Sequence, residues 1–459
     1  MLNKFQLTEI LEDWNYWNNT EIPKEKIGWV RQDFLTQIIS SLPRKEIIAL
    51  QGVRRGGKST LMYQIMNYLI IEKHIENEQI LYLNFEDFKL INDLKIDLLE
   101  NFYNLYREKY NPKKYVYIFL DEIQNIPNWE KWLRTYFDRG DNVKFIISGS
   151  SSKLMSGELS TLLTGRNLTY TIYPFSFSEY LSSQEVKIKK EDDWFKFYLA
   201  NKKNHALIKN YLDKYLHFGG FPEVAKEKNE LIQKKLLNQY LTDIIYKDVS
   251  DRYKLREVKN IFDLAIYSFT NIGHSLGIKK LSRILEQSPK TISDLLFYLE
   301  KAYLLLTSHF FSFSFKNTIN KRQPRKIYSL DNGFVKISSK SFTQNFGFLY
   351  ENTVAQTLSR NGYDLLYWKN TEGKIEKTEV DFIIKHQGKI LPINVTYDDN
   401  VKDREIDGII DFCQKKGLTI KQGIIITNDL MNEEKINKIK IIFCPLWVFL
   451  LTGSFPKFT

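Results

Sequence analysis

Apolar residues in the first part of the chain gather in short, continuous runs that alternate with longer stretches of helical spacing. Five runs read as strands: Ile47–Gly52, Ile80–Phe85, Tyr115–Glu122, Lys144–Ser150 and Leu168–Pro174. Because these runs are continuous rather than alternating, both faces of each strand must be buried, as in a parallel sheet covered by helices. The pattern predicts an α/β domain over residues 1–185.

The pattern changes further along the chain. Residues 186–256 have helical spacing with charged faces and are interrupted by two glycines and a proline at Phe218–Pro222, which predicts a helical lid or connector. Residues 257–337 combine helices with two strand-like runs. Residues 338–459 begin with a helix and continue with strands, so we expect a second, smaller α/β domain there.

Composition narrows the class of protein. The 459 residues include 66 Lys and Arg against 55 Asp and Glu, and 43% are hydrophobic, which indicates a basic but folded protein. The two cysteines, Cys413 and Cys444, cannot form a disulfide framework and indicate a reducing compartment, so we expect a cytoplasmic location. The longest apolar run, Ile441–Leu451, is too short for a membrane span and contains Pro445. The net charge of +11 fits either codon bias or nucleic-acid binding.

The segment after the first strand has the pattern of a phosphate-binding loop. It precedes a helical run and reads Gly52-Val53-Arg54-Arg55-Gly56-Gly57-Lys58-Ser59-Thr60. Glycines let backbone N–H groups turn toward phosphate oxygens, and the amino end of the next helix adds partial positive charge. Lys58 neutralises β- and γ-phosphate charge, and the Ser59 hydroxyl holds Mg²⁺. The loop is therefore predicted to bind a nucleoside triphosphate.

An acidic pair ends the third strand-like run and supplies the second half of such a site. Asp121 is expected to hold the Mg²⁺ shell through water, and Glu122 to polarise the attacking water. Together with the loop, the pair predicts ATP or GTP hydrolysis.

Two more polar residues are candidates for this site. Ser148 ends the next strand. It is expected to position the water or to read the γ-phosphate, and the alternative is that it caps a following helix. Arg166 precedes the last strand. It is either a γ-phosphate sensor or arginine finger, acting in cis or from a neighbouring subunit, or an ordinary surface arginine.

The order of these motifs resembles one protein family, the bacterial and archaeal AAA-superfamily ATPases with a C-terminal domain of unknown function, DUF4143. The resemblance rests on GVRRGGKST, LNFED, FLDEIQNIPNWEKWLR, ISGSSSKLMSGELSTLLTGR, YPFSFSEYL and HFGGFPEV. It implies an ASCE-type P-loop core that uses ATP, with the acidic pair at Asp121 and Glu122 and a sensor position at Ser148.

Residues 279–306 have the spacing of two helices joined by a turn at Ser288-Pro289, and resemble the winged-helix segment of this family. The two strand runs that follow would form a hairpin wing. DNA is one partner of such modules, and a protein partner stays open as the alternative. The residues expected to meet DNA are Lys290, Lys316, Lys321, Arg322, Arg325 and Lys326.

Residues 338–459 resemble the restriction-endonuclease-like core seen in this family, with Glu351 on a helix and Asp381 in the segment Glu379-Val-Asp381. In active members the following strand carries a carboxylate and a lysine, two residues apart. Here the corresponding residues are Asn394-Val395-Thr396, so one metal ligand has lost its charge and the lysine is missing. Two carboxylates alone make a poor site for a hard cation. We therefore expect a fold retained for binding or assembly rather than for cutting.

The sequence as a whole predicts a Mg²⁺-dependent AAA-type ATPase. Its hydrolysis would change how the helical lid, the winged-helix region and the endonuclease-like domain pack, on DNA or on a DNA-bound complex. One alternative is a nucleotide-gated protein–protein switch, and another is an ATP-dependent nuclease. No pattern indicates a membrane partner, and an oligomer stays open.

Overall fold

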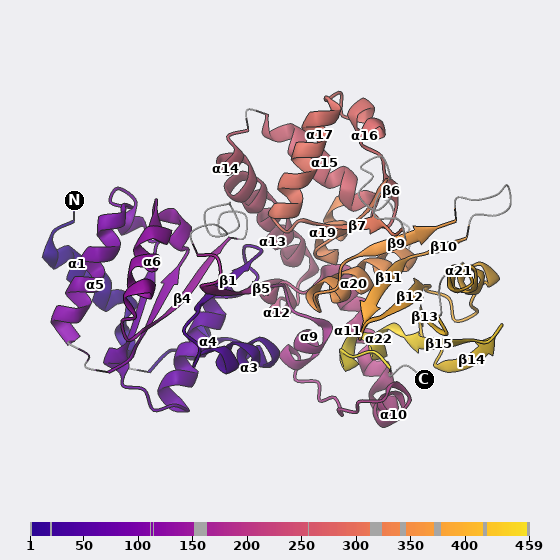
Figure 1. Ribbon diagram of the computed structural model, residues 1–459, viewed down its shortest axis with the longest axis horizontal. Coiled ribbons are helices and arrows are strands. Elements are labelled where there is room, and N and C mark those ends of the chain that lie inside the picture. The colour runs from indigo at the N-terminus through magenta and orange to yellow at the C-terminus, as the bar shows by residue number, and fades with distance from the viewer. Residues whose placement is uncertain are drawn as a thin grey trace. The chain divides into compact units, whose positions relative to one another are not determined.

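The computed structural model describes residues 2–18, 21–110, 112, 114–150, 163–255, 257–312, 324–339, 346–370, 378–415 and 420–456. The chain forms two compact units, Met1–Tyr173 and Pro174–Thr459 (Figure 1). Helix α9 (Phe177–Ser183) lies in the second unit, where Phe177 packs against Tyr215. The predicted domain boundary at residue 185 stays a prediction.

The first unit is built on a sheet of five parallel strands, as predicted. Their order is β2-β3-β4-β1-β5, and their bounds are β1 Ile47–Gly52, β2 Ile80–Asn84, β3 Val116–Asp121, β4 Val143–Ser150 and β5 Asn167–Ile172. Strand β4 lies between β1 and β3. The ends of β1 and β3 therefore lie at the same edge of the sheet, one strand apart.

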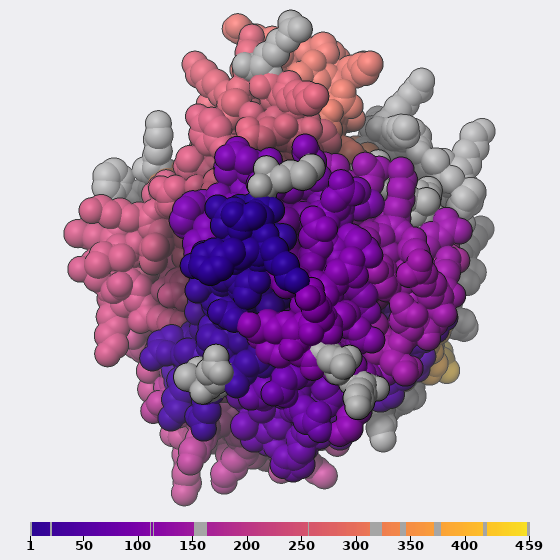
Figure 2. Space-filling model, turned by 90° about the vertical axis from the view of Figure 1, so that its left-hand side faces the viewer, coloured from indigo at the N-terminus to yellow at the C-terminus, as the bar shows by residue number. Residues whose placement is uncertain are grey.

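Helices cover both faces of this sheet. They are α1 Lys4–Trp14, α2 Lys24–Ile27, α3 Gln32–Ser41, α4 Lys58–Ile71, α5 Ile96–Tyr110 and α6 Trp129–Arg139. Along β1, Ile47 and Ala49 join one hydrophobic core, and Ile48 and Leu50 join the other. This double burial is why the strand reads as a continuous apolar run. Figure 2 shows the indigo N-terminal residues lying against the purple surface of the same unit.

The second unit contains a group of helices, and the turn Phe218–Pro222 lies among them. They are α9, α10 Trp194–Asn201, α11 His205–Phe218, α12 Pro222–Lys226, α13 Glu230–Asp243, the π-helical turn Ile244–Ser250, α14 Asp251–Tyr253, α15 Val258–Thr270 and α19 Asn332–Ser338. At the turn, the Asp331 carboxylate accepts hydrogen bonds from the backbone N–H of Gly220, at 2.7 Å, and of Gly333, at 2.8 Å. A turn in one part of the sequence is thus fixed by a buried carboxylate from another.

A helix–turn–helix follows, at the spacing that the sequence predicts. Helices α16 (Ile278–Ile284) and α17 (Pro289–Lys301) are joined at Ser288, which caps α17, and strands β7 (Leu305–Phe310) and β8 (Arg325–Ser329) pair antiparallel. The short strand β6 is Ser275–Leu276.

The expected boundary at residue 338 does not separate two sheets. Strand β7 also pairs with β9 (Leu366–Lys369), and β9 pairs with β10 (Glu379–Val380), in one sheet of order β10-β9-β7-β8-β6. The segment predicted to be a winged helix and the segment predicted to be the last domain are therefore joined by backbone hydrogen bonds.

The remaining strands form a third sheet, of order β11-β12-β13-β15-β14. Its strands are β11 Phe382–His386, β12 Lys389–Val395, β13 Gln422–Thr427, β14 Asn432–Ile436 and β15 Ile439–Pro445, and the helices that accompany it are α20 Phe346–Arg360, α21 Asp403–Cys413 and α22 Leu446–Thr452. The β14–β15 hairpin is not predicted from the sequence, because β14 is a largely exposed, charged strand without an apolar alternation. Both cysteines are free and buried. Among the helices of the described residues, none is long and apolar enough to cross a membrane.

Candidate nucleotide-binding site

The loop between β1 and α4 owes its shape to residues with a left-handed backbone. Gly52, Arg55 and Gly57 have φ angles of 143°, 65° and 94°. Gly52 pairs with Ile172 of β5, and a Cβ on Gly52 would lie 2.1 Å from the Ile172 carbonyl oxygen. The neighbouring strand therefore leaves room only for glycine at this position.

Lys58 is the first residue of α4 and lies within this loop. Its ammonium donates to the carbonyl oxygens of Gly52 and Val53, each at 3.2 Å, and the residue is buried. A fixed cation at the amino end of a helix makes a strong anion site. Ser59 and Thr60 follow in the first turn of the same helix, where the hydroxyl of Ser59 is partly exposed.

Arg31 supports the phosphate-binding loop, a role that the sequence did not predict. The residue is 1% exposed, and its guanidinium Nη1 donates to the Gly56 carbonyl oxygen at 2.8 Å. Its backbone N–H donates to Gln64 Oε1, and Gln64 Nε2 donates to the carbonyls of Ile27 and Trp29. A lone arginine upstream of the motif carries no spacing signal, because its partner is set by the tertiary fold.

Asp121 ends β3 and is completely buried. The Tyr82 hydroxyl donates to one carboxylate oxygen at 2.8 Å, and the Ser148 hydroxyl donates to the other. Burial raises the pKa of Tyr82 well above its usual value, so the phenol stays a donor. Tyr82 was not predicted, although it lies in the strand run next to the acidic strand.

Glu122 follows directly, in a left-handed backbone conformation with φ 53°. Burial raises the pKa of its carboxyl group, and the charges of Lys58 and Arg54 oppose that rise. Its backbone N–H donates to Ser148 Oγ at 3.2 Å, and the Gln124 amide contacts its Oε2. A carboxylate with a raised pKa is a better proton acceptor than an ordinary surface glutamate. The loop that carries Lys58 follows β1, and Glu122 follows β3, so both lie at the same edge of the sheet.

Ser148 lies in β4 and is completely buried. The alternative that it caps the following helix stays a prediction, because residues 151–162 lie outside the described residues. The Ser148 hydroxyl contacts both members of the acidic pair, as described above. This position supports a role in holding Asp121 and Glu122, and its predicted role as a phosphate sensor stays a prediction.

The prediction that Arg166 reads the γ-phosphate in cis is wrong. Its backbone carbonyl accepts from Ile47 N–H, at the beginning of β1, whereas the phosphate-binding loop begins at Gly52, where β1 ends. That separation is roughly 16 Å along the strands. The guanidinium pairs instead with Asp138, at 3.0 Å. A role in trans stays a prediction.

The donor set also fits the predicted Mg²⁺ ion. Mg²⁺ prefers oxygen ligands and is usually held by one or two carboxylates together with substrate phosphates. Ser59 and Asp121 offer a hydroxyl and a carboxylate. Among the described residues, no group of three or more His, Cys, Asp and Glu is arranged around a metal.

Comparison with known proteins decides the family. An AAA domain matches residues 44–181, a domain of unknown function (DUF8612) residues 209–344, and another (DUF4143) residues 346–447. An uncharacterized protein of Methanocaldococcus jannaschii is 34% identical over 452 residues, which cover 95% of this chain and 94% of that protein. The chain belongs to the P-loop ATPases that join an AAA domain to a C-terminal DUF4143 domain.

Two more proteins are similar to this AAA–DUF4143 ATPase at lower identity. An uncharacterized protein of Haemophilus influenzae is 28% identical over 429 residues, covering 91% of this chain and 98% of the relative. A solved structure, the Walker-type ATPase PABY2304 of Pyrococcus abyssi, is 14% identical, with a TM-score of 0.39. It covers 68% of this chain and 96% of that one. A similarity this low carries no argument about function.

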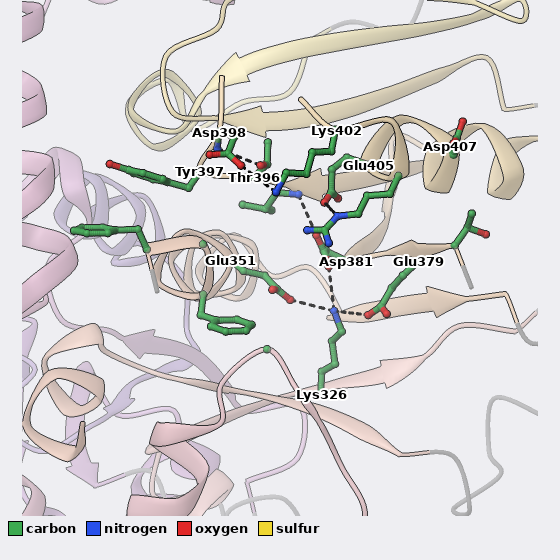
Figure 3. Close-up of a pocket in the computed structure, with 17 residues that line it drawn as sticks. Lys326, Glu351, Glu379, Asp381, Thr396, Tyr397, Asp398, Lys402, Glu405 and Asp407 are labelled. Carbon is green, nitrogen blue, oxygen red and sulfur yellow. Dashed lines mark hydrogen bonds and ion pairs between the residues drawn. The ribbon is translucent and has the colours of Figure 1, made fainter. Parts of the chain in front are cut away.

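The DUF4143 domain contributes to a large pocket outside the ATPase core (Figure 3). Its volume is about 1050 Å³, and its lining includes Glu351, Glu379, Asp381 and Lys326. The structure thus brings the two predicted carboxylates, Glu351 and Asp381, together. Asn394, which stands where active members carry a carboxylate, donates its amide to the backbone carbonyls of Glu379 and Glu405.

The basic residues predicted to contact DNA fall into three groups. Lys316, Lys321 and Arg322 lie outside the described residues. Lys290 is exposed on α17, and Arg325 is partly exposed, with Glu300 at 3.8 Å. The prediction for Lys326 is wrong: this residue is 3% exposed and ion-paired in the pocket, so it is not available to phosphates at a hairpin tip.

The position of Lys58 leads to a testable prediction. Lys58→Ala removes a buried ammonium from the loop while leaving the rest of the loop in place. We expect ATP affinity to fall at least ~30-fold, about 2 kcal/mol, because a buried charge partner of the phosphates is lost. Isothermal titration with a non-hydrolysable ATP analogue measures this. Lys73→Ala, at the other end of the same helix, is the matched control and should bind normally.

Proposed function

We propose that this protein hydrolyses ATP with Mg²⁺ at the loop Gly52–Thr60 and that Glu122 activates the water. The observation that carries the proposal is that the loop with Lys58 follows β1 and Glu122 follows β3 at one edge of the sheet, one strand apart. The loop amides and Lys58 hold the phosphates, and Glu122 accepts the water proton as the bond from the γ-phosphorus to the ADP oxygen breaks. Mg²⁺, when bound, neutralises developing phosphate charge.

The remaining residues position these groups. Tyr82 and Ser148 occupy both oxygens of Asp121, so that carboxylate has one fixed orientation. The Ser148 hydroxyl also accepts a hydrogen bond from the Glu122 N–H, so both acidic residues are bonded to one hydroxyl. Such fixed donors and acceptors act without reorganisation during the reaction.

We further propose that hydrolysis repositions the C-terminal region on DNA. The helix–turn–helix supports this, because its apolar residues Ile292, Leu295 and Leu299 are buried. Its exposed side chains include the basic residues Lys279, Lys280, Arg283 and Lys290. Basic residues on the outside of such a motif can meet phosphates, and the second helix can enter a major groove.

Reversing two of these charges tests the DNA proposal. We expect Arg283→Glu with Lys290→Glu to weaken binding of duplex DNA more than tenfold and to lower the slope of log affinity against log salt by about 2. Fluorescence anisotropy at several salt concentrations measures both quantities.

The matched control reverses two exposed lysines elsewhere in the same unit, Lys228→Glu with Lys235→Glu. This variant has the same net charge and should bind DNA nearly as well as the wild type. Equal weakening in the control, or binding that salt does not affect, contradicts the proposal. If duplex DNA neither binds nor changes turnover, the protein–protein switch becomes the better account.

A further inference from the structure

The Lys326 side chain ends at a point where three carboxylates meet. Its Nζ lies 3.1 Å from Glu351, 2.8 Å from Glu379 and 3.1 Å from Asp381, and Lys326 is only 3% exposed. Figure 3 shows the side chain pointing from its strand toward the space between Glu351 and Glu379. Glu351 lies in α20 and Glu379 lies in β10. Asp381 is the residue between β10 and β11.

Carboxylate oxygens are ligands that a hard divalent cation prefers, but these three surround an ammonium group, and no group of three or more His, Cys, Asp and Glu among the described residues is arranged to hold a metal ion. Thr396 stands where active members carry a lysine. In this chain a lysine reaches the carboxylates from another element, β8, which lies outside the residues that match DUF4143. It does not stand beside the carboxylates but between them.

The hydrogen bonds around the cluster leave little room for another cation. Asp381 accepts from Lys326 on one carboxylate oxygen and from the Val395 backbone N–H, at 3.0 Å, on the other. Asn394 Oδ1 accepts from the Asp381 N–H at 3.0 Å. The side chain at the altered motif position therefore holds backbone in place and offers no ligand to an ion.

A second ammonium also meets the cluster, because Lys369 Nζ lies 2.8 Å from Glu379.

We propose that Lys326 is the built-in cation of this pocket. Its ammonium occupies the place of a divalent ion, so the wild-type pocket takes no Mg²⁺ or Mn²⁺ and does not cut phosphodiesters by metal-dependent chemistry. The same carboxylates bind a divalent ion once the ammonium is removed. This inference is independent of the proposed ATPase activity.

Titration of the nucleotide-free full chain with Mn²⁺, followed by electron paramagnetic resonance of the free ion, tests the proposal. We expect Lys326→Ala to gain one Mn²⁺ per chain, bound at least tenfold more tightly than by the wild type. Adding Asp381→Asn should abolish the gain. Lys326→Arg keeps a cation in place and should behave as the wild type.

Two results would overturn the proposal. One is a wild-type chain that binds Mn²⁺ in a manner lost in Asp381→Asn, since lysine and metal would then coexist. The other is a folded Lys326→Ala or Lys326→Met chain that binds Mn²⁺ no better than the wild type. If both variants are recovered unfolded, Mn²⁺ present during refolding should restore them, and a failure to restore them also contradicts the proposal.

Discussion

Glu122→Gln should lower ATP turnover by about 10²- to 10⁴-fold, the usual contribution of a positioned general base. Glutamine keeps the shape of the side chain but cannot accept the water proton. The loop residues and Lys58 are unchanged, so ATP binding should stay within a fewfold of the wild type. Phosphate release under saturating ATP measures the first quantity, and titration with ATP itself the second.

A matched control for this substitution exists in the second unit. Glu185 also has a left-handed backbone, with φ 59°, and is exposed. Glu185→Gln makes the same chemical change away from the loop and should leave turnover unchanged. If Glu122→Gln turns over ATP at the wild-type rate, Glu122 is not the base. If it loses ATP binding as well, its role is structural.

Gly220→Ala should destabilise the second unit by at least ~3 kcal/mol and lower its melting temperature by roughly 5–10 °C. A Cβ on Gly220 would lie 2.2 Å from the Phe175 carbonyl oxygen, a backbone atom that cannot rotate away. Phe175 and Gly220 are also hydrogen-bonded, with the Phe175 N–H 2.6 Å from the Gly220 carbonyl oxygen. Relieving the clash would therefore break this pairing and disturb the Asp331 contacts to the same turn.

Differential scanning calorimetry of the full chain checks this result by comparing the melting temperatures of the variant and the wild type. Gly277→Ala is the control: Gly277 has a negative φ of −91°, and no atom lies within 4 Å of a Cβ placed there. It should change the melting temperature little. A Gly220→Ala chain as stable as this control would show that the turn is not packed as described.

Much of the ATPase core could be predicted from the sequence because its signals are local. The apolar residues of β1, Ile47–Leu50, each pack into one of two cores, which gives the strand its continuous apolar run, and the loop is recognised by glycines at fixed spacing. The residues that complete the site are different. Arg31 and Tyr82 act on Gly56 and Asp121, which are distant in sequence, so no spacing indicates their roles.

The errors have a common physical cause. The position of Arg166 before a strand leaves open a role at the nucleotide in cis, but the register of β5 on β1 puts it at the opposite end of the sheet. Lys326 was assigned to an exposed wing, yet it faces carboxylates from α20 and β10. Partner strands determine which end of a strand lies at the site and which of its side chains face charged groups. The local sequence pattern does not identify those partner strands.

Phosphate release by the purified wild-type chain and by Lys58→Ala, measured side by side with Mg²⁺ and ATP, tests the central claim most directly. We expect steady release by the wild type, which stops when Mg²⁺ is chelated, and release near background by Lys58→Ala. No release by the wild type, with or without duplex DNA, or equal release by both chains would contradict it.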